Sequence, residues 1–289
     1  MTGRLLALAL LLGLGSACRT AEPRAAPAPR PESVPHPAFV PRSGEEIVVC
    51  GRRFFVGTRV VLWTEPPGYD ASDASGPHGL RYQPGRREKG EAGRVYVEPG
   101  SEDLEALRET VDQFVLHYDA AGTSERCFRV LQDERGMSVH FLLDVDGTIY
   151  QTLDLRDQAW HATKANPRSI GVEIANLGAH AAGEGKGIRG VVQGLDLEQL
   201  AFTPRQYESL ARLAAALCVV FPRIAADAPR DAAGRVRTTV LSEPEFESFH
   251  GILGHFHVQA NKQDPGPAFD WEAFLASVRG VLAEGAPAP

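Results

Sequence analysis

The residues with the clearest chemical potential are two histidines and one aspartate that lie far apart in the sequence. His117 ends a short apolar run, His255 follows Gly254, and Asp264 precedes Pro265. Two imidazoles and one carboxylate, with a fourth position left open, form a ligand set that suits a catalytic zinc ion. The sequence has no helical histidine pair of the His-Glu-x-x-His type, so spacing alone does not single out these three residues.

Other histidines are also candidates for the site, because the chain contains nine. His140 belongs to a predicted β-hairpin, which favours a structural role or a place beside a metal ligand. His257 is an alternative ligand, because it lies between His255 and Asp264. The residues by themselves leave these alternatives open.

Apolar periodicity predicts the elements that position these side chains. Apolar residues at helical spacing across residues 104–111 lead into an apolar strand that ends at His117. Residues 139–145 and 148–151 flank Asp146-Gly147, a pair that is typical of the turn of a β-hairpin. The first half of the domain is therefore predicted to alternate helix and strand.

The second half continues the same mixture. Residues 170–174 alternate apolar and other residues, which predicts a strand with Glu173 on its polar face. Residues 203–206 combine a capping threonine, a proline at the first helical position and a glutamine three after the cap, so a helix is predicted to run from there to near Pro222. A last helix is predicted from Asp270. Strands mixed with packed helices make this an α/β protein.

The N-terminus has the pattern of a secretory signal peptide over residues 1–17, with an arginine, an apolar run and three small residues before Cys18. The apolar run is about half of the ~20 residues that a membrane-spanning helix needs. Residues 14–18 resemble a bacterial lipoprotein cleavage box. We therefore expect Cys18 to carry the lipid that anchors the mature protein to a membrane.

Three further segments follow. Residues 18–44 are rich in proline and alanine and are predicted to form an extended tether. Residues 45–100 are predicted to form an N-terminal β extension and a long loop, and we assign no chemistry to the Gly- and Pro-rich part from Pro66 to Gly90. Residues 101–284 are predicted to form the catalytic domain, since 43% of the chain is apolar and can bury one sizeable core.

Charge and cysteine content narrow the possible partners. The formal net charge is −7 and is spread along the chain, which argues against nucleic acid as a partner. We expect a monomer. Cys50, Cys127 and Cys218 remain after Cys18, so at most one disulfide can form among them.

Several motifs occur in order between Phe114 and Trp271, and together they resemble a known family. They are Val115-Leu116-His117-Tyr118, Met137-Ser138-Val139-His140-Phe141-Leu142-Leu143, Asp146-Gly147-Thr148-Ile149-Tyr150-Gln151, Ala159-Trp160-His161-Ala162, Asn166, Ser169-Ile170-Gly171-Val172-Glu173-Ile174, Gly254-His255 and Lys262-Gln263-Asp264-Pro265-Gly266-Pro267-Ala268-Phe269-Asp270-Trp271. This set resembles the amidase family that includes peptidoglycan-recognition proteins, phage T7 lysozyme and the bacterial anhydro-muropeptide amidases. The fold that the resemblance implies is α/β, with a central mixed β-sheet flanked by helices.

The resemblance also implies roles for individual residues. It implies that His117, His255 and Asp264 bind Zn²⁺, and that His161 and Asn166 line the substrate cleft. An aspartate rather than a cysteine as the third ligand matches the bacterial enzymes.

Proton transfer and charge stabilisation are assigned to two further residues. Some relatives use a tyrosine just before the hairpin histidine, but Val139 stands there in this chain, so Glu173 is expected to be the general base. Lys262 is expected to stabilise the oxyanion of the tetrahedral intermediate.

The expected activity is zinc-dependent hydrolysis of the amide between N-acetylmuramic acid and L-alanine in peptidoglycan or muropeptides. The alternative is a non-catalytic peptidoglycan-binding receptor or an envelope tether with the same fold. The expected partners are peptidoglycan and, through the lipid on Cys18, a membrane. Arg19 is not the aspartate that retains many lipoproteins at the inner membrane, so we expect the periplasmic side of an outer membrane.

Overall fold

A computed structural model of the protein describes residues 44–89, 93–183, 185 and 187–285. The predicted signal peptide, Cys18 and the tether as far as residue 43 lie outside the described residues. Within the described part, we find no helix with both the length and the apolarity needed to cross a bilayer.

The helices and strands follow one another along the chain in a mixed order. Their bounds are β1 Glu46–Val49, β2 Arg52–Phe55, β3 Val60–Leu62, β4 Tyr82–Gln83, β5 Arg86–Arg87, β6 Val95–Val97, α1 Leu104–Thr110, β7 Gln113–Tyr118, α2 Ser124–Arg129, the π-helical turn η1 Val130–Arg135, β8 Phe141–Leu143, β9 Ile149–Gln151, β10 Gln158–Ala159, the 3-10 turn η2 Thr163–Arg168, β11 Ser169–Ile174, β12 Ala179–Ala181, β13 Ile188–Val192, β14 Leu195–Gln199, α3 Pro204–Val220, α4 Glu243–Ser248, β15 Gly251–Gly254, α5 His255–Val258 and α6 Trp271–Ala283.

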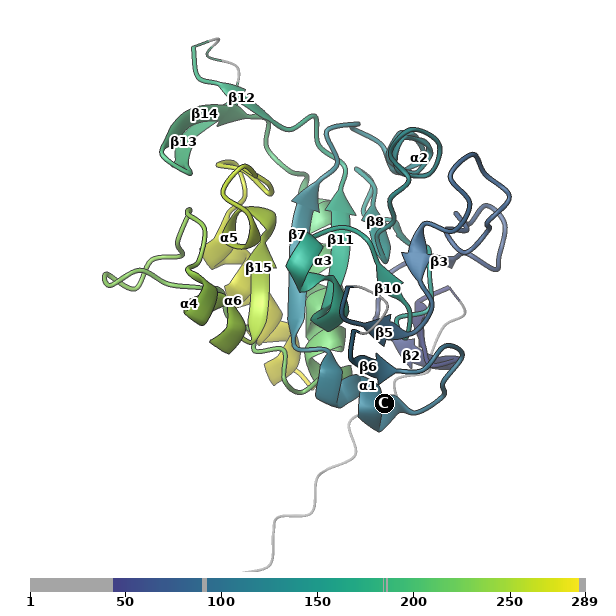
Figure 1. The fold of residues 1–289 in the computed structure, drawn as a ribbon. Helices are drawn as coiled ribbons and strands as arrows, with labels where there is room; N and C mark the ends of the chain where they lie inside the picture. Colours follow the sequence, from purple (N-terminus) through teal and green to yellow (C-terminus); the bar gives the residue numbers. More distant parts are fainter. Residues whose placement is uncertain (1–43, 90–92, 184, 186, 286–289) are drawn as a thin grey trace, which may run out of the picture. The chain divides into compact units, whose positions relative to one another are not determined.

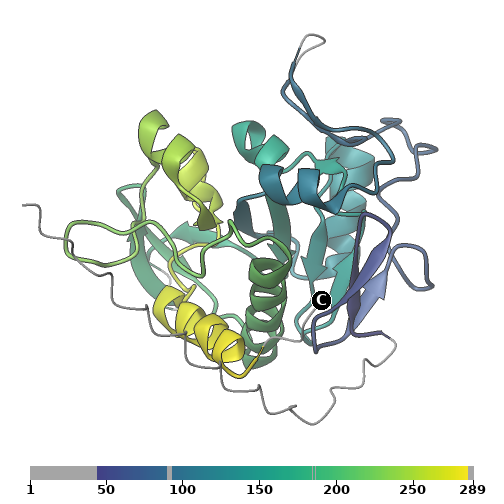
Figure 2. The same cartoon turned by 90° about the horizontal axis from the view of Figure 1, so that it is seen from below.

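A six-stranded mixed sheet forms the centre of the domain, in the order β15-β7-β11-β8-β9-β3 (Figure 1). The neighbours from β15 to β8 are parallel, β9 is antiparallel to β8, and β3 is parallel to β9. Helices α3 and α6 pack against each other and lie along the sheet, as the view from below shows (Figure 2). The predicted α/β class, with a central mixed sheet flanked by helices, is confirmed.

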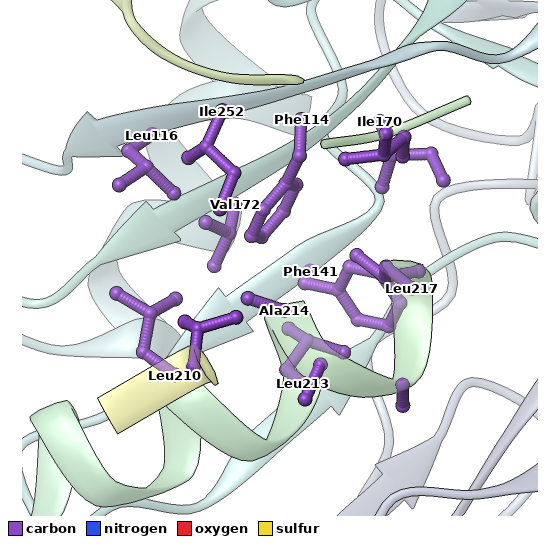
Figure 3. Close-up of a cluster of buried hydrophobic side chains, with 14 of the residues drawn as sticks. Phe114, Leu116, Phe141, Ile170, Val172, Leu210, Leu213, Ala214, Leu217 and Ile252 are labelled. Carbon is purple, nitrogen blue, oxygen red and sulfur yellow. The ribbon is translucent and has the colours of Figure 1, made fainter. Parts of the chain in front are cut away.

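The main core lies between the sheet and α3, and strand alternation decides which side chains enter it. Phe114 and Leu116 of β7, Ile170 and Val172 of β11, and Ile252 of β15 are fully buried against α3 (Figure 3). The residues between them in the sequence belong to the opposite face of the sheet. Val115 and Leu253 pack there in a second, smaller cluster. That opposite face is the one that carries the site.

Capping explains where the long helices begin. In α3, Thr203 accepts a hydrogen bond from the N–H of Gln206, and the side chain of Gln206 accepts one from the N–H of Thr203. This is the predicted capping box, and α3 ends at Val220, close to the predicted end. Asp270 caps α6 through the N–H of Ala273. Both helices therefore confirm the prediction from local sequence.

Other parts of the fold are not visible in the local pattern. Strand β2 pairs with β1, and the Gly-rich stretch after β11 forms the three-stranded sheet β12-β14-β13. Strand β3, from the predicted N-terminal extension, is an edge strand of the central sheet. Cys50, Cys127 and Cys218 are all free thiols.

Candidate metal centre

Strand register brings three of the predicted site residues side by side. His117 of β7 is paired with Glu173 of β11, and Leu116 is paired with Gly254 of β15. His255, the next residue after Gly254, therefore comes level with His117 at the carboxyl ends of the adjacent parallel strands β15, β7 and β11. Open α/β sheets place their binding sites at these strand ends.

Asp264 completes the cluster from the loop that follows α5. The Nδ1 atoms of His117 and His255 are 3.0 Å apart, and Oδ2 of Asp264 lies 2.8 Å from the first and 2.9 Å from the second. All three residues are buried. A tetrahedral zinc ion with bonds of about 2.0–2.1 Å separates its ligand atoms by about 3.3 Å, so a small outward shift accommodates one. The donor set of two nitrogens and one oxygen fits such an ion.

The local electrostatics keep these groups ready to bind a cation. Burial and, to a lesser degree, the neighbouring His255 lower the pKa of His117 to about 4, although Asp264 opposes the shift. Burial alone would raise the pKa of Asp264, but His255 and His117 outweigh burial and lower it. At neutral pH, His117 is therefore a neutral imidazole and Asp264 a carboxylate, which are the protonation states that metal ligation requires.

His117 and His255 each have a hydrogen-bond partner on Nε2, the ring nitrogen that does not face the other two candidate ligands. With Nδ1 facing the metal position, Nε2 of His117 carries the hydrogen and donates to Nδ1 of His161 over 3.0 Å. His161 then carries its hydrogen on Nε2, which lies 3.2 Å from the hydroxyl of Ser169. By the same reasoning, Nε2 of His255 donates to Oε1 of Gln259 over 2.7 Å. These bonds fix the ring orientations and the tautomers.

Two glycines make room for these arrangements. A Cβ atom at Gly171 of β11 would lie 2.6 Å from Nδ1 of His161, so only glycine lets that ring pack beside the strand. Gly266 has a φ of 89°, and a Cβ atom there would lie 2.1 Å from Oε1 of Gln199. Gln199 of β14 bonds the carbonyl of Pro265 and the N–H of Ala268. It therefore holds the loop that carries Asp264.

Glu173 is poised to exchange protons. Its Oε2 atom is buried and has no hydrogen-bond partner among the described residues. Burial raises the pKa of Glu173 well above its usual value, Asp264 and Asp119 raise it further, and Lys262 opposes the rise. A carboxylate whose pKa is raised holds a proton more strongly than an exposed one, so the environment suits a general base.

A cavity of about 1010 Å³ opens beside the cluster. His255, His161, Asn166 and Lys262 all line it, so the two predicted substrate-binding residues and the predicted oxyanion lysine face the same space. Asn166 also accepts hydrogen bonds through Oδ1 from the N–H groups of His161 and Ala162. His161 is only 5% exposed, and its ring nitrogens are engaged as described. It therefore supports His117 as well as lining the cavity.

The competing histidines are accounted for. Both ring nitrogens of His257 are used, since Nδ1 accepts from the N–H of Gly254 and Nε2 donates to the carbonyl of Arg237. His140 is fully buried, accepts from the N–H of Gly171 and donates to the carbonyl of Asp157. Neither ring has a nitrogen free for a metal among these contacts, which favours a supporting role for both histidines.

Part of the cavity wall is formed by residues to which the sequence analysis assigns no role. Gln83, Arg87, Glu88 and Lys89 line the cavity, although they belong to the loop region before the predicted catalytic domain. Gln259 was also missed. A glutamine four residues after His255 at the start of a short helix is the one signal that could have revealed it.

The family model described as N-acetylmuramoyl-L-alanine amidase matches residues 107–267, more than half of the chain. The three candidate metal ligands and Glu173 all lie inside the matched region. The chain therefore belongs to the N-acetylmuramoyl-L-alanine amidase family.

Curated relatives carry a more particular name. The chain is 27% identical over 152 residues to the 1,6-anhydro-N-acetylmuramyl-L-alanine amidase AmpD of Haemophilus influenzae, an alignment that covers 50% of this chain and 59% of the relative. It is 29% identical over 151 residues to AmpD of Escherichia coli K12, which covers 49% and 58%. The chain thus spans less than two thirds of the length of these relatives.

Two solved structures are similar to this chain over part of its length. The amidase AmiD of E. coli, in complex with anhydro-N-acetylmuramic acid-L-Ala-D-gamma-Glu-L-Lys, is 22% identical, with a TM-score of 0.40 and coverage of 58% of this chain and 57% of AmiD. The Drosophila peptidoglycan-recognition protein SA is 13% identical, with a TM-score of 0.37 and coverage of 74% and 88%. With TM-scores this low, the fold assignment rests on the family match and the observed sheet.

Proposed function

We propose that this protein is a zinc-dependent N-acetylmuramoyl-L-alanine amidase that acts on peptidoglycan or muropeptides. The observation that carries the proposal is the convergence of His117 Nδ1, His255 Nδ1 and Asp264 Oδ2 within hydrogen-bond distance of one another, with Glu173 on the adjacent strand. When bound by these three residues, zinc would make water a stronger acid and polarise the carbonyl of the amide. The family match supports the choice of amide.

The protein's own residues supply the remaining steps. Glu173 takes the proton from the attacking water on its unpaired Oε2 and delivers it to the nitrogen of L-alanine as the C–N bond breaks. Lys262 stabilises the negative charge that develops on the carbonyl oxygen. His161 holds the ring of His117 in the ligating orientation. One water is consumed, and the products are the lactyl carboxylate of muramic acid and a free alanine amine.

The substrate assignment is tested by digestion of purified peptidoglycan and of a defined anhydro-muropeptide, followed by mass spectrometry of the products. The proposal predicts two new ends, a free N-terminal L-alanine and a newly formed lactyl carboxylate on muramic acid. Cleavage within the stem peptide would instead identify a zinc peptidase. Tight binding of peptidoglycan without any cleavage, by a fully metal-loaded protein, would identify a receptor or an envelope tether.

We also propose that the mature protein is a monomer attached to the periplasmic side of an outer membrane through lipid on Cys18. The support is the leader pattern of residues 1–17 and the proline-rich segment after it. A Cys18→Ser variant should move from the membrane fraction to the soluble fraction and should keep the hydrolytic activity of the domain. Continued membrane attachment of the variant would contradict the lipid anchor.

A further inference from the structure

One wall of the cavity is formed by residues that precede the family-matched region in the sequence. This wall is built around Arg86 and Arg87, the two consecutive arginines of β5. Successive side chains of a strand point to opposite sides, so Arg86 and Arg87 face different environments. Arg86 is fully buried, whereas Arg87 lines the cavity. This short strand therefore has an anchored side and a side that faces the cavity.

Arg86 fixes the strand to the catalytic domain. Its guanidinium donates to the carbonyl of Leu155 over 2.7 Å and to the carbonyl of Ser169 over 2.9 Å, and it reaches the carbonyls of Asn166 and Pro167 at 3.4 and 3.3 Å. The carbonyls of Asn166, Pro167 and Ser169 belong to the segment around η2 that leads into β11, and that of Leu155 lies just before β10. The main chain before Arg86 is also tied down, because Gly85 N–H donates to Oδ1 of Asp157.

Arg87 is held by its backbone and left unpaired at its charged end. Its N–H donates to Oε1 of Gln158 over 3.1 Å. The Nε atom of Arg87 is buried without a hydrogen-bond partner, and no carboxylate among the described residues forms an ion pair with it. The terminal nitrogens of Arg87, which lines the cavity, also make no hydrogen bond with the described residues, so they can donate to a ligand oxygen there.

The charges around the cavity favour an anion. Among the described lining residues, one carboxylate is present, that of Glu88, and it accepts hydrogen bonds from the hydroxyl of Tyr96 and the N–H of Arg94. The cation of Lys164 is paired with Glu243. Arg87, Lys89 and Lys262 remain as cations with no ion-pair partner in the described part of the chain. Because these three cations face one lining carboxylate, the lining of the cavity has a net positive charge.

We propose that Arg87 is a specificity-determining residue that binds a free carboxylate of the substrate's stem peptide. The inference rests on the proposed amidase function. In a peptide such as the L-Ala-D-gamma-Glu-L-Lys bound to AmiD, the gamma linkage leaves the α-carboxylate of the glutamate free. A guanidinium carried by a strand whose backbone is already fixed can form paired charge-assisted hydrogen bonds with such a group. Residues 83–89 thus add recognition of an acidic peptide to a domain that begins later in the sequence.

The test compares three synthetic muramyl tripeptides on the metal-loaded protein. One has free carboxylates, one has an amide in place of the glutamate α-carboxylate, and one has an amide at the C-terminus. We expect the wild-type protein to hydrolyse the free form with a kcat/KM about 10- to 100-fold higher than one of the two amidated forms, the range for a lost charge-assisted hydrogen bond. The amidated substrate with the lower kcat/KM identifies the carboxylate that Arg87 contacts.

In the Arg87→Gln variant, we expect this preference to collapse to within about threefold, through a higher KM for the free substrate and a nearly unchanged kcat. Arg87→Lys should keep part of the preference, because a point charge replaces the paired donors. The matched control is Arg94→Gln, since Arg94 lies on the neighbouring strand region, over the ring of Tyr96, and does not line the cavity. This control should keep the wild-type preference.

Direct binding separates this inference from the amidase assignment. In a Glu173→Gln background, calorimetry with the free and amidated tripeptides should show the same loss of affinity when Arg87 is replaced. Equal kcat/KM for all three substrates in the wild type, or an unchanged preference in a folded Arg87→Gln protein, would overturn the role of Arg87 while leaving the amidase intact. Absence of hydrolysis together with carboxylate-dependent binding would overturn the amidase and keep the role of Arg87.

Discussion

The two sides of the cavity are built in different ways. The metal side consists of the ends of β15, β7 and β11, where parallel register sets His255, His117 and Glu173 side by side. Another wall comes from β4 and β5, two-residue strands that pair with β10 and β6, and Arg86 of β5 also binds distant backbone carbonyls. The proposed reactive groups thus lie at the ends of central strands, and the proposed recognition group lies on a short strand attached to them through side chains.

The largest effect on activity is expected from removing one of the proposed metal ligands. A His255→Ala variant removes one of three ligands, so bound zinc should fall below about one tenth of an equivalent. Hydrolysis should fall by about 10³-fold or more, because the ion contributes several kcal/mol and each 1.4 kcal/mol is a factor of ten. Elemental analysis and a muropeptide assay on the same sample measure both. An active variant without metal would remove the basis of the mechanism.

Proton transfer can be removed while the metal stays. Glu173→Gln keeps the shape of the side chain but loses the proton acceptor, so kcat should fall about 10²- to 10⁴-fold. Zinc content and muropeptide affinity should match the wild type. If kcat instead changes by less than a few fold, another group transfers the proton, and His161 would be examined next through a pH–rate profile.

A smaller effect is expected from replacing a residue that is hydrogen-bonded to a proposed metal ligand. His161→Phe retains a ring beside Gly171 but removes the acceptor for Nε2–H of His117. The affinity for zinc should fall about 10- to 100-fold, which competition with a chelator measures without any turnover. Ser169→Ala, which removes only the partner of His161, should have a weaker effect of the same sign. Wild-type affinity in His161→Phe would show that this histidine has no part in orienting the ligand.

The smallest effect is a purely structural one. Thr203→Ala removes half of the capping box of α3, which lies behind the sheet and away from the cavity. It should lower the free energy of unfolding by about 1 kcal/mol and Tm by about 2–4 °C. kcat/KM at 25 °C should not change. A loss of activity in a folded variant would mean that the scaffold and the site are coupled in a way that the packing does not show.

Local sequence was enough to predict the elements that carry their own signals. The capping residues of α3, the alternation of β11 and the turn after β8 each depend on neighbours along the chain, so their positions were predicted closely. The order of strands across the sheet depends on contacts between distant segments. For this reason the pairing of His117 with Glu173 had no local signature.

The candidate site divides in the same way. The grouping of His117, His255 and Asp264 came from family resemblance rather than from spacing, because their ligand atoms meet only after the sheet has formed. The wall formed by Arg86 and Arg87 was missed altogether. The hydrogen bonds that hold this wall join residues that are 69 to 83 positions apart in the sequence. Hydrophobic periodicity gives no signal for a side chain that binds such distant carbonyls.

The central claim is that one zinc ion, held by His117, His255 and Asp264, is required for cleavage of the amide next to muramic acid. The most direct measurement is a titration of zinc into chelator-treated wild-type protein, with bound metal and muropeptide hydrolysis followed in each sample. The account predicts that hydrolysis is absent without metal and rises in proportion to zinc up to one equivalent per chain, with no further gain. Full hydrolysis in the metal-free protein, or an activity that continues to rise well beyond one equivalent, would contradict it.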